Sequence, residues 1–288
     1  MAEAPSARAS HRLLLLAAAL LFSTGGAAIK SASLTPWQVA SFRSAVASVF
    51  LFLALPDARR GWNWRILPVA AAYAATLISF VISTRLTTAA NAIFLQSTAP
   101  LYVLLLSPLV LHERIGRGDV LYMLSVAVGM SLFFVGAESA VATAPDPARG
   151  NLVALVSGVT YACMLIGLRW LARTGRGAAT VATVALGNVL AFVIALPFAL
   201  PVEPTRLRSS LPVILYLGIV QIGVAYFCLT RGIRHVPALE ATTLLMLEPA
   251  MNPVFTWMAH GEKPGPLKLA GGAVILCATL VNTWRQSR

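Results

Sequence analysis

Charged residues are scarce in this sequence. Asp, Glu, Lys and Arg make up 11% of the 288 residues and hydrophobic residues make up 58%, whereas a soluble domain has about 25% charged residues. A water-soluble fold of this length has too little interior to hide so much apolar surface. The composition therefore excludes an ordinary soluble domain and indicates a chain surrounded by lipid.

Groups that carry catalytic or metal chemistry are also few. The three cysteines, Cys163, Cys228 and Cys277, lie within apolar segments and lack metal-ligand spacing. The four histidines are scattered near segment ends without paired ligand spacing. No Gly-x-x-x-x-Gly-Lys-Ser/Thr loop is present, which argues against direct ATP hydrolysis by this chain. We therefore expect no disulfide, metal, cofactor or enzymatic activity.

The excess of positive charge, formally +12, does not indicate nucleic-acid binding. The Lys and Arg residues fall mainly in short connections between apolar segments, as the basic flanks of membrane helices do. The expected partners are the lipid bilayer and a small-molecule substrate, with protons or a counter-substrate as candidates for coupling.

Ten apolar segments are long enough to cross a bilayer, because about 20 helical residues span a hydrocarbon core of about 30 Å. We place them at residues 13–31, 37–55, 66–85, 90–111, 119–137, 151–171, 178–200, 211–231, 238–259 and 266–284. The opening run could also be a signal peptide, but it continues past Phe22 without a convincing cleavage site. We interpret it as the first span.

Two stretches of the chain repeat the same pattern, shifted by 234 − 85 = 149 residues. The positions Arg85, Ala89, Ala92, Leu95, Pro100, Glu113 and Gly116 recur as Arg234, Ala238, Ala241, Leu244, Pro249, Glu262 and Gly265. The duplication predicts a first repeat at 13–137 and a second at 151–284, joined by an external linker at 138–150, with tails at 1–12 and 285–288. Duplicated bundles of spanning helices are typical of secondary transporters.

The basic residues also predict the orientation of the chain. With the N-terminus inside, Lys and Arg are about twice as frequent in the inner connections as in the outer ones, which places both termini in the cytoplasm. Five helices per repeat is an odd number, so the two repeats have opposite orientations in the membrane. The fold class is an all-α integral membrane protein with ten transmembrane helices as two inverted five-helix repeats, and alternating access suits this arrangement.

The segments Phe22–Lys30, Trp37–Arg43, Arg85–Arg114 and Arg234–Lys263 carry a family resemblance. In both halves a patch of small residues is followed by proline and then by Glu-Arg or Glu-Lys, and this pattern resembles the paired EamA domains of the drug/metabolite transporter superfamily. The likeness covers residues 13 to 284. It implies a ten-helix bundle in the plasma (inner) membrane and a central cavity lined chiefly by the first, third, fourth, sixth, eighth and ninth helices. It also implies export or exchange of small metabolites.

Two ionisable residues lie deep within predicted spans. A charge in hydrocarbon costs about 2.5–3.5 kcal/mol on insertion scales and persists mainly where it faces a cavity or a partner. Glu248, about halfway along the ninth span, is a candidate for binding a cation or a proton, or for fixing helix packing through a basic partner. Arg43 could bind an anionic group or pair with an acid. Lys30 is interpreted as an interfacial anchor at the outer end of the first span.

Neutral polar residues within the spans are weaker candidates for the substrate site, since such side chains also join helices to one another. They are Asn91, Gln96, Tyr102, Tyr161, Gln221, Tyr226 and Asn252. Three prolines, Pro100, Pro249 and Pro253, are candidates for helix breaks, because each leaves the carbonyl four residues earlier without its hydrogen bond.

The sequence thus predicts a secondary transporter, an exporter or exchanger of small metabolites such as amino acids or related compounds. A lipid-carrier translocase of the same fold remains an alternative and would need a lateral opening for an isoprenoid tail. An integral-membrane enzyme or sensor is the other alternative. An enzyme would need polar groups clustered at one membrane face, whereas the polar groups of this sequence are dispersed.

Overall fold

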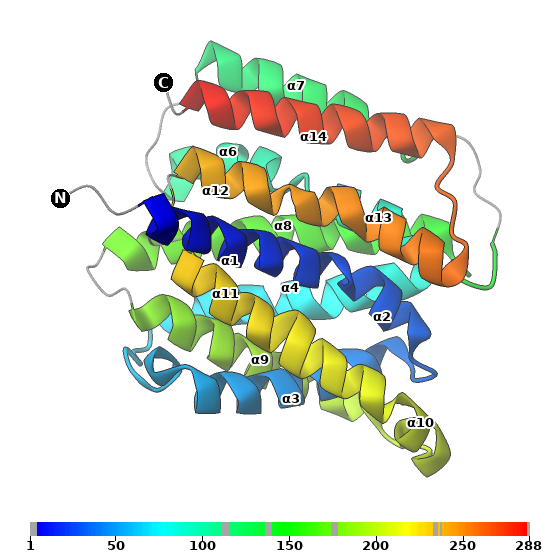
Figure 1. Cartoon of the computed structure of the whole chain (residues 1–288). Helices are drawn as coiled ribbons and strands as arrows, with labels where there is room; N and C mark the ends of the chain where they lie inside the picture. The colour runs from blue at the N-terminus through cyan, green and yellow to red at the C-terminus, as the bar shows by residue number, and fades with distance from the viewer. Residues whose placement is uncertain are drawn as a thin grey trace.

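The computed structural model describes residues 5–110, 116–135, 140–173, 178–232, 236 and 238–286. The predicted inner connections around Glu113 and Arg234, and part of the predicted linker at 138–150, lie outside the described residues. The described residues fold into helices and their connections (Figure 1).

The first half of the chain contains α1 (Pro5–Ser23), α2 (Gly25–Ser31), α3 (Pro36–Ala54), the short 3-10 helix η1 (Pro56–Arg59), α4 (Ile66–Leu86), α5 (Ala89–Gln96), α6 (Ala99–Val110) and α7 (Arg117–Ser131). The second half contains α8 (Pro147–Arg173), α9 (Ala178–Ala199), α10 (Pro204–Leu215), the π-helical segment η2 (Tyr216–Val224), α11 (Ala225–Gly232), α12 (Ala238–Leu245), α13 (Leu247–His260) and α14 (Pro266–Gln286).

Eight helical stretches among the described residues are long and apolar enough to cross a membrane. They run over Ser10–Ser31, Pro36–Ala54, Ile66–Leu86, Ala89–Leu106, Pro147–Leu171, Ala179–Ala199, Pro204–Gly232 and Pro266–Arg285. Each matches one predicted span. The other two predicted spans, 119–137 and 238–259, are a 15-residue helix (α7) and a pair of helices of 8 and 14 residues (α12 and α13).

Hydrogen bonds from Lys268 to the segment after α7 account for the early end of that helix. The Lys268 ammonium group, on α14, donates hydrogen bonds to the carbonyls of Leu132 (3.3 Å), Phe133 (2.9 Å) and Val135 (3.1 Å). Carbonyls at a helix end lack partners within the helix. A lysine from the neighbouring helix satisfies them here, so the chain can leave the helix at Ser131 without leaving these groups bare.

Local sequence signals account for several helix limits. Thr35 and Gln38 form a capping box before α3, in which the Thr35 hydroxyl accepts from the Gln38 amide and the Gln38 side chain accepts from the Thr35 amide, with Pro36 at the first helical position. Thr88 caps α5 by accepting from the Asn91 amide. Gly261 ends α13 with φ 68°, a left-handed conformation that favours glycine.

Helices are interrupted near two of the three predicted prolines. The break between α5 and α6 precedes Pro100, and the break between α12 and α13, at Met246, precedes Pro249. The two prolines occupy equivalent repeat positions. By contrast, α13 runs through Pro253 without interruption, which differs from the sequence prediction. A single proline removes only one backbone hydrogen bond, and packing against α1 and α2 holds α13 in helical form.

The two halves of the chain pack across one another rather than side by side. In the first half, α4 packs on α8 and α9, and α5 and α6 pack on α8; in the second, α11, α12 and α13 pack on α1. The helices α3 and α9 form one pair and α7 and α14 another, the latter at the top of Figure 1. Small residues permit close approach, as where Gly187 lies against the Tyr73 ring and Gly167 against Val69.

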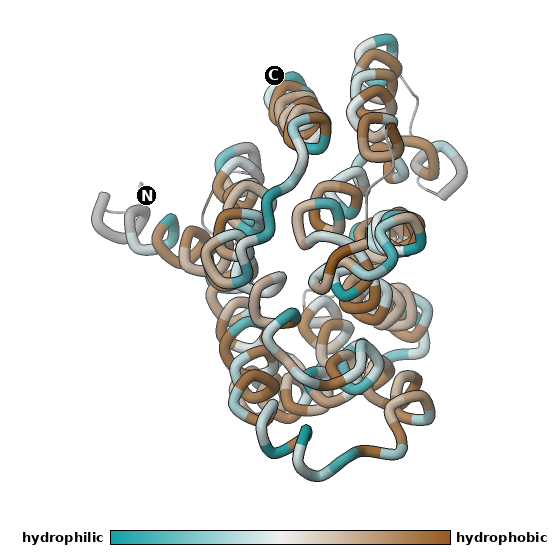
Figure 2. Tube along the Cα trace, turned by 90° about the vertical axis from the view of Figure 1, so that its right-hand side faces the viewer, coloured by the Kyte–Doolittle hydropathy of each residue, from teal (hydrophilic) through white to brown (hydrophobic). Residues whose placement is uncertain are grey.

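The bundle has two ends. The start of α1 and the last turn of α14 lie at the same end (Figure 1), which we call the terminal end; the connection from α13 to α14 lies at the other, the opposite end. Figure 2 views the chain from the opposite end: hydrophobic residues spread around the helices and hydrophilic residues gather in the connections. Outward-facing apolar residues such as Leu53, Leu121 and Met258 are exposed in the isolated chain, as expected for a lipid-facing surface.

Candidate functional site

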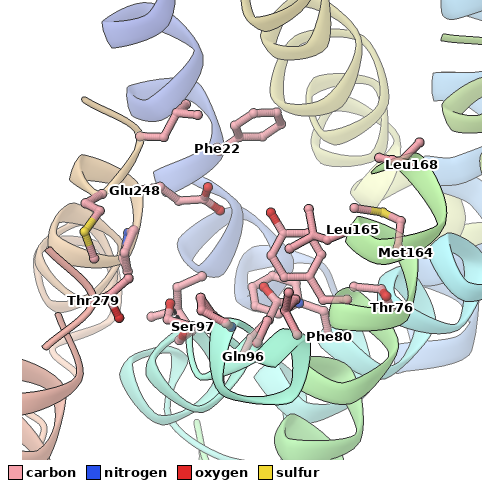
Figure 3. Close-up of a pocket in the computed structure, with 18 of the residues that line it drawn as sticks. Phe22, Thr76, Phe80, Gln96, Ser97, Met164, Leu165, Leu168, Glu248 and Thr279 are labelled. Carbon is pink, nitrogen blue, oxygen red and sulfur yellow. Dashed lines mark hydrogen bonds between the residues drawn. The ribbon is translucent and has the colours of Figure 1, made fainter. Parts of the chain in front are cut away.

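A cavity of about 1450 Å³ lies within the helix bundle (Figure 3). Residues from α1, α3, α4, α5, α6, α7, α8, η2, α11, α12, α13 and α14 line it. Its lining runs from Phe22, Gln221 and Glu248 in the middle of the bundle to Asp119 and Arg285 at the terminal end. The cavity therefore reaches the terminal end. None of its lining residues comes from the connections at the opposite end.

Six of the nine predicted polar candidates line this cavity. They are Arg43, Gln96, Tyr161, Gln221, Tyr226 and Glu248, together with Pro100 and Pro249. Gln96 donates to the Ser157 hydroxyl at 2.7 Å, and the Gln221 amide lies 3.5 Å from the Phe22 carbonyl. The structure thus brings together side chains that are far apart in the sequence. Their role in binding stays a prediction.

Glu248 lies in the first turn of α13, directly after the break at Met246. Its side chain points into the cavity, opposite Met164, Leu165 and Leu168 of α8 (Figure 3). The N-terminus of a helix carries a partial positive charge, which stabilises a carboxylate in the first turn. Glu248 makes no hydrogen bond or ion pair with any residue that the structure describes.

Arg43 is buried in the middle of α3, with 1% of its surface exposed. One guanidinium nitrogen donates to the Leu77 carbonyl at 3.2 Å, and its Nε has no partner. The predicted acidic partner is absent among the described residues, so Arg43 and Glu248 are separate charges on one cavity.

Aromatic side chains form one wall of the cavity. The rings of Phe22 and Tyr226 are 5.2 Å apart in an edge-to-face arrangement, and those of Tyr73 and Tyr226 are 6.1 Å apart. Asn188 donates to the Tyr73 hydroxyl at 3.4 Å. Phe22 and Tyr73 were not among the sequence candidates. Phe22 stands eight residues before Lys30 as Tyr161 stands eight before Arg169, and this spacing could have identified it.

Three predicted polar candidates lie away from the cavity lining. Asn91 donates to Asn151 of α8 at 3.1 Å, and the Tyr102 hydroxyl donates to the Met130 sulfur at 3.7 Å. Asn252, 1% exposed, lies against Gly26 of α2, where an added Cβ would overlap its side-chain oxygen. Asn91 and Tyr102 thus join helices by their hydrogen bonds, whereas Asn252 packs between α13 and α2 and its side-chain amide has no hydrogen-bond partner among the described residues.

A buried ion pair joins two segments at the opposite end of the bundle. Lys30 Nζ lies 2.7 Å from Glu262 Oε1, and the two side chains are 3% and 4% exposed. Lys30 also donates to the carbonyls of Thr87 and Thr143, and Glu262 accepts from the Ala89 amide at 3.0 Å. The interpretation of Lys30 as an interfacial anchor is therefore wrong, because its side chain is buried among three other segments of the chain, around Thr87, Thr143 and Glu262.

Further hydrogen bonds connect segments at the same end of the bundle. His260, in the last turn of α13, is 2.8 Å from the Ala27 carbonyl of α2, and Arg85 donates to the carbonyls of Ala32 (2.9 Å) and Leu34 (3.1 Å). The terminal end differs. There the Arg285 side chain pairs with Asp119 beside the cavity, and Arg12 pairs with Glu240 at the surface. Among the described residues, no cluster of three His, Cys, Asp or Glu side chains is arranged as a metal site.

Known proteins resemble this chain over most of its length. A sequence profile of the EamA-like transporter family matches residues 10–135 and 148–284. The pseudopaline exporter CntI of Pseudomonas aeruginosa is 26% identical over 280 residues, which are 93% of this chain and 94% of the exporter. The uncharacterized transporter YwfM of Bacillus subtilis is 24% identical over 279 residues, 94% of this chain and 93% of its own length.

A solved crystal structure shares the fold. It covers 97% of this chain and 99% of its own, with a TM-score of 0.62 and 18% sequence identity. At this identity the match supports the fold alone. The profile matches two separate ranges, one in each half of the chain.

Proposed function

The chain belongs to the EamA-like transporter family, and we propose that it is a secondary transporter that exports or exchanges small metabolites by alternating access. The observation that carries this proposal is the contrast between the two ends. A cavity of about 1450 Å³ reaches the terminal end, while the buried Lys30–Glu262 pair closes the opposite end. A closed end opposite an open cavity is the arrangement expected for one state of an alternating-access cycle.

Helix pairing supports the inverted ten-helix arrangement. If the predicted spans are numbered in order, an inverted repeat exchanges the first with the sixth, the third with the eighth and the fourth with the ninth. The contacts follow this exchange: α4 and α5 pack on α8, while α11 and α13 pack on α1. The second and seventh spans (α3 and α9) pair with each other, as do the fifth and tenth (α7 and α14). In this proposal α7 and the broken helix formed by α12 and α13 are the two remaining spans.

Basic residues support a cytoplasmic location for the terminal end. The cavity then faces the cytoplasm, where an exporter takes up its cargo. One relative is named as an exporter, which also favours export over uptake. Amino acids or related compounds fit the size of the cavity and its mixture of charged, aromatic and apolar side chains. The site that we propose consists of the cavity-lining residues, with Glu248 as the principal binding or coupling group.

The proposed export is tested by comparing the small molecules in the medium of two cultures. Cells that express the protein and cells that express Glu248→Gln at the same membrane level are grown side by side, and the small molecules in the medium are profiled. We expect at least one metabolite to accumulate in the medium only with the unchanged protein. Identical media in both cultures, for a protein shown to be folded in the membrane, would contradict export.

A further inference from the structure

One charge at the centre of the cavity has no counter-charge. Two acidic residues line the cavity, Asp119 and Glu248. Asp119 is paired with Arg285 at the terminal end. Glu248 lies in the middle of the bundle and has neither hydrogen bond nor ion pair to any described residue. A carboxylate inside the membrane region is costly unless a partner compensates it, and the described residues offer Glu248 only the partial positive charge of the α13 N-terminus.

Aromatic rings line the same cavity as this carboxylate. Phe22, Tyr73 and Tyr226 form a continuous wall from α1, α4 and α11, with ring centres 5.2 Å and 6.1 Å apart. Tyr161 of α8 also lines the cavity. Aromatic faces attract cations, including those that lack N–H groups.

Arg43 does not supply the missing positive charge. It is 1% exposed and its guanidinium group donates to the Leu77 carbonyl. It lines the same cavity as Tyr73 and Tyr226 of the aromatic wall. Arg43 makes no ion pair with Glu248 in the part of the chain that the structure describes, so the Glu248 carboxylate keeps an uncompensated charge.

We propose that Glu248, Phe22, Tyr161 and Tyr226 form a binding site for the positively charged nitrogen of a small organic amine, and that such amines are the substrate class of this transporter. This inference rests on the proposed transport function. In this proposal the Glu248 carboxylate binds the positively charged nitrogen, and the aromatic rings contact the groups attached to that nitrogen. Met164, Leu165 and Leu168, which face Glu248 across the cavity, receive the apolar part of the molecule (Figure 3).

Binding of three probes of similar shape to the purified full chain tests the proposal. They are phenethylamine, its N-trimethyl derivative and 2-phenylethanol, which differ in charge and in N–H donors. We expect both cations to bind, and the neutral alcohol to have a Kd at least about tenfold higher. Binding is measured by isothermal titration calorimetry in detergent. Equal affinity for the alcohol and the two cations would overturn the proposal.

Variants show whether the cations occupy this site. Glu248→Gln nearly preserves the shape of the side chain and removes its charge, and Tyr226→Leu removes one ring. Both are expected to raise the Kd of the cations by about tenfold or more. Glu240→Gln, at the surface on α12, is the matched control and is expected to bind as the unchanged protein does. Cation binding that is unchanged in folded Glu248→Gln protein would overturn the proposal, and so would binding of neither cation to the unchanged protein.

The experiments distinguish a failure of the amine-binding proposal from a failure of the transport proposal. If the medium changes with expression while neither cation binds, the transport proposal stands and the amine site is wrong. If the cations bind as expected but no metabolite crosses the membrane, the binding site stands and the transport proposal is wrong. An effect of Glu248→Gln on transport without any cation binding would assign Glu248 to proton coupling instead.

Discussion

Lys30 and Glu262 form an ion pair of 2.7 Å at the opposite end of the bundle, with both side chains almost completely buried. Removing one partner of such a pair leaves a buried charge without compensation, which costs about 3–5 kcal/mol. We therefore expect Lys30→Gln and Glu262→Gln each to lower the thermal unfolding temperature of the purified protein. Breaking the exposed Arg12–Glu240 pair by Arg12→Gln is the control and should cost about 1 kcal/mol or less.

The same variants also test whether this pair acts as a closure. Thr256, 1% exposed, lies on α13 between the cavity and the ion pair. Thr256→Cys, in a background without the three native cysteines, should react slowly with a water-soluble thiol reagent and faster when Lys30→Gln is added. Equal rates in the two backgrounds, with both proteins folded, would mean that the pair stabilises the bundle without closing it.

A second prediction concerns Glu248. Glu248→Gln should reach the membrane at nearly normal levels and lose most of its transport, because the substitution removes a charge that has no partner among the described residues. Glu240→Gln on the neighbouring helix α12 is the matched control and should keep its transport. The measurement is the difference in medium composition for cells at equal protein levels. Full transport by Glu248→Gln at several pH values would remove Glu248 from the site.

Orientation of the chain gives a third prediction. Figure 1 shows the connection from α3 to α4, which contains Arg59, at the terminal end and the connection from α13 to α14, which contains Lys263, at the opposite end. Both side chains are exposed. With both termini in the cytoplasm, a cysteine at position 263 should react with a membrane-impermeant reagent on intact cells, and a cysteine at position 59 only after permeabilisation. Labelling of position 59 and protection of position 263 on intact cells would reverse the orientation. Labelling of both would contradict the proposed topology.

A fourth prediction comes from the close contact between α2 and α13. A Cβ at Gly26 would overlap the side-chain oxygen of Asn252 and come within 2.9 Å of the Ala89 Cβ, whereas nothing lies within 4 Å of a Cβ at Gly265. We expect Gly26→Ala to lower the unfolding temperature, by a cost of about 1–3 kcal/mol for overpacking. Gly265→Ala should have little effect. Equal unfolding temperatures for the two variants would show that α2 and α13 can separate without cost.

Much of the fold and several cavity residues could be predicted from the sequence, by hydropathy and by the free-energy cost of a charge within a membrane span. The eight apolar stretches were found because length and hydropathy determine them locally, and Glu248 and Arg43 were placed at a cavity because a charge within a span needs a reason. Contacts between side chains of helices that are distant in the sequence could not be predicted in this way. The interactions of Lys30 with Glu262 and of Asn91 with Asn151 depend on how distant helices approach each other, which no local pattern reveals.

The last prediction concerns movement of the two broken helices. Pro100 and Pro249 occupy the same repeat position, and each follows a break, between α5 and α6 and between α12 and α13. Each proline leaves the carbonyl four residues earlier, at Gln96 or Leu245, without its helical hydrogen bond, so the helix can flex there. If the repeats exchange conformations during transport, both breaks should move in every cycle.

Ser97 and Met246 lie at these breaks and line the cavity, so they can report on this movement. Each is replaced by cysteine in turn, in a background without the native cysteines, and its rate of reaction with a water-soluble thiol reagent is measured with and without cargo. We expect cargo to change both rates, because a substrate that is carried must favour one conformation over the other. A change at one site only would limit the movement to that half. Rates independent of cargo at both sites, in variants that still transport, would make the breaks static features that shape the cavity.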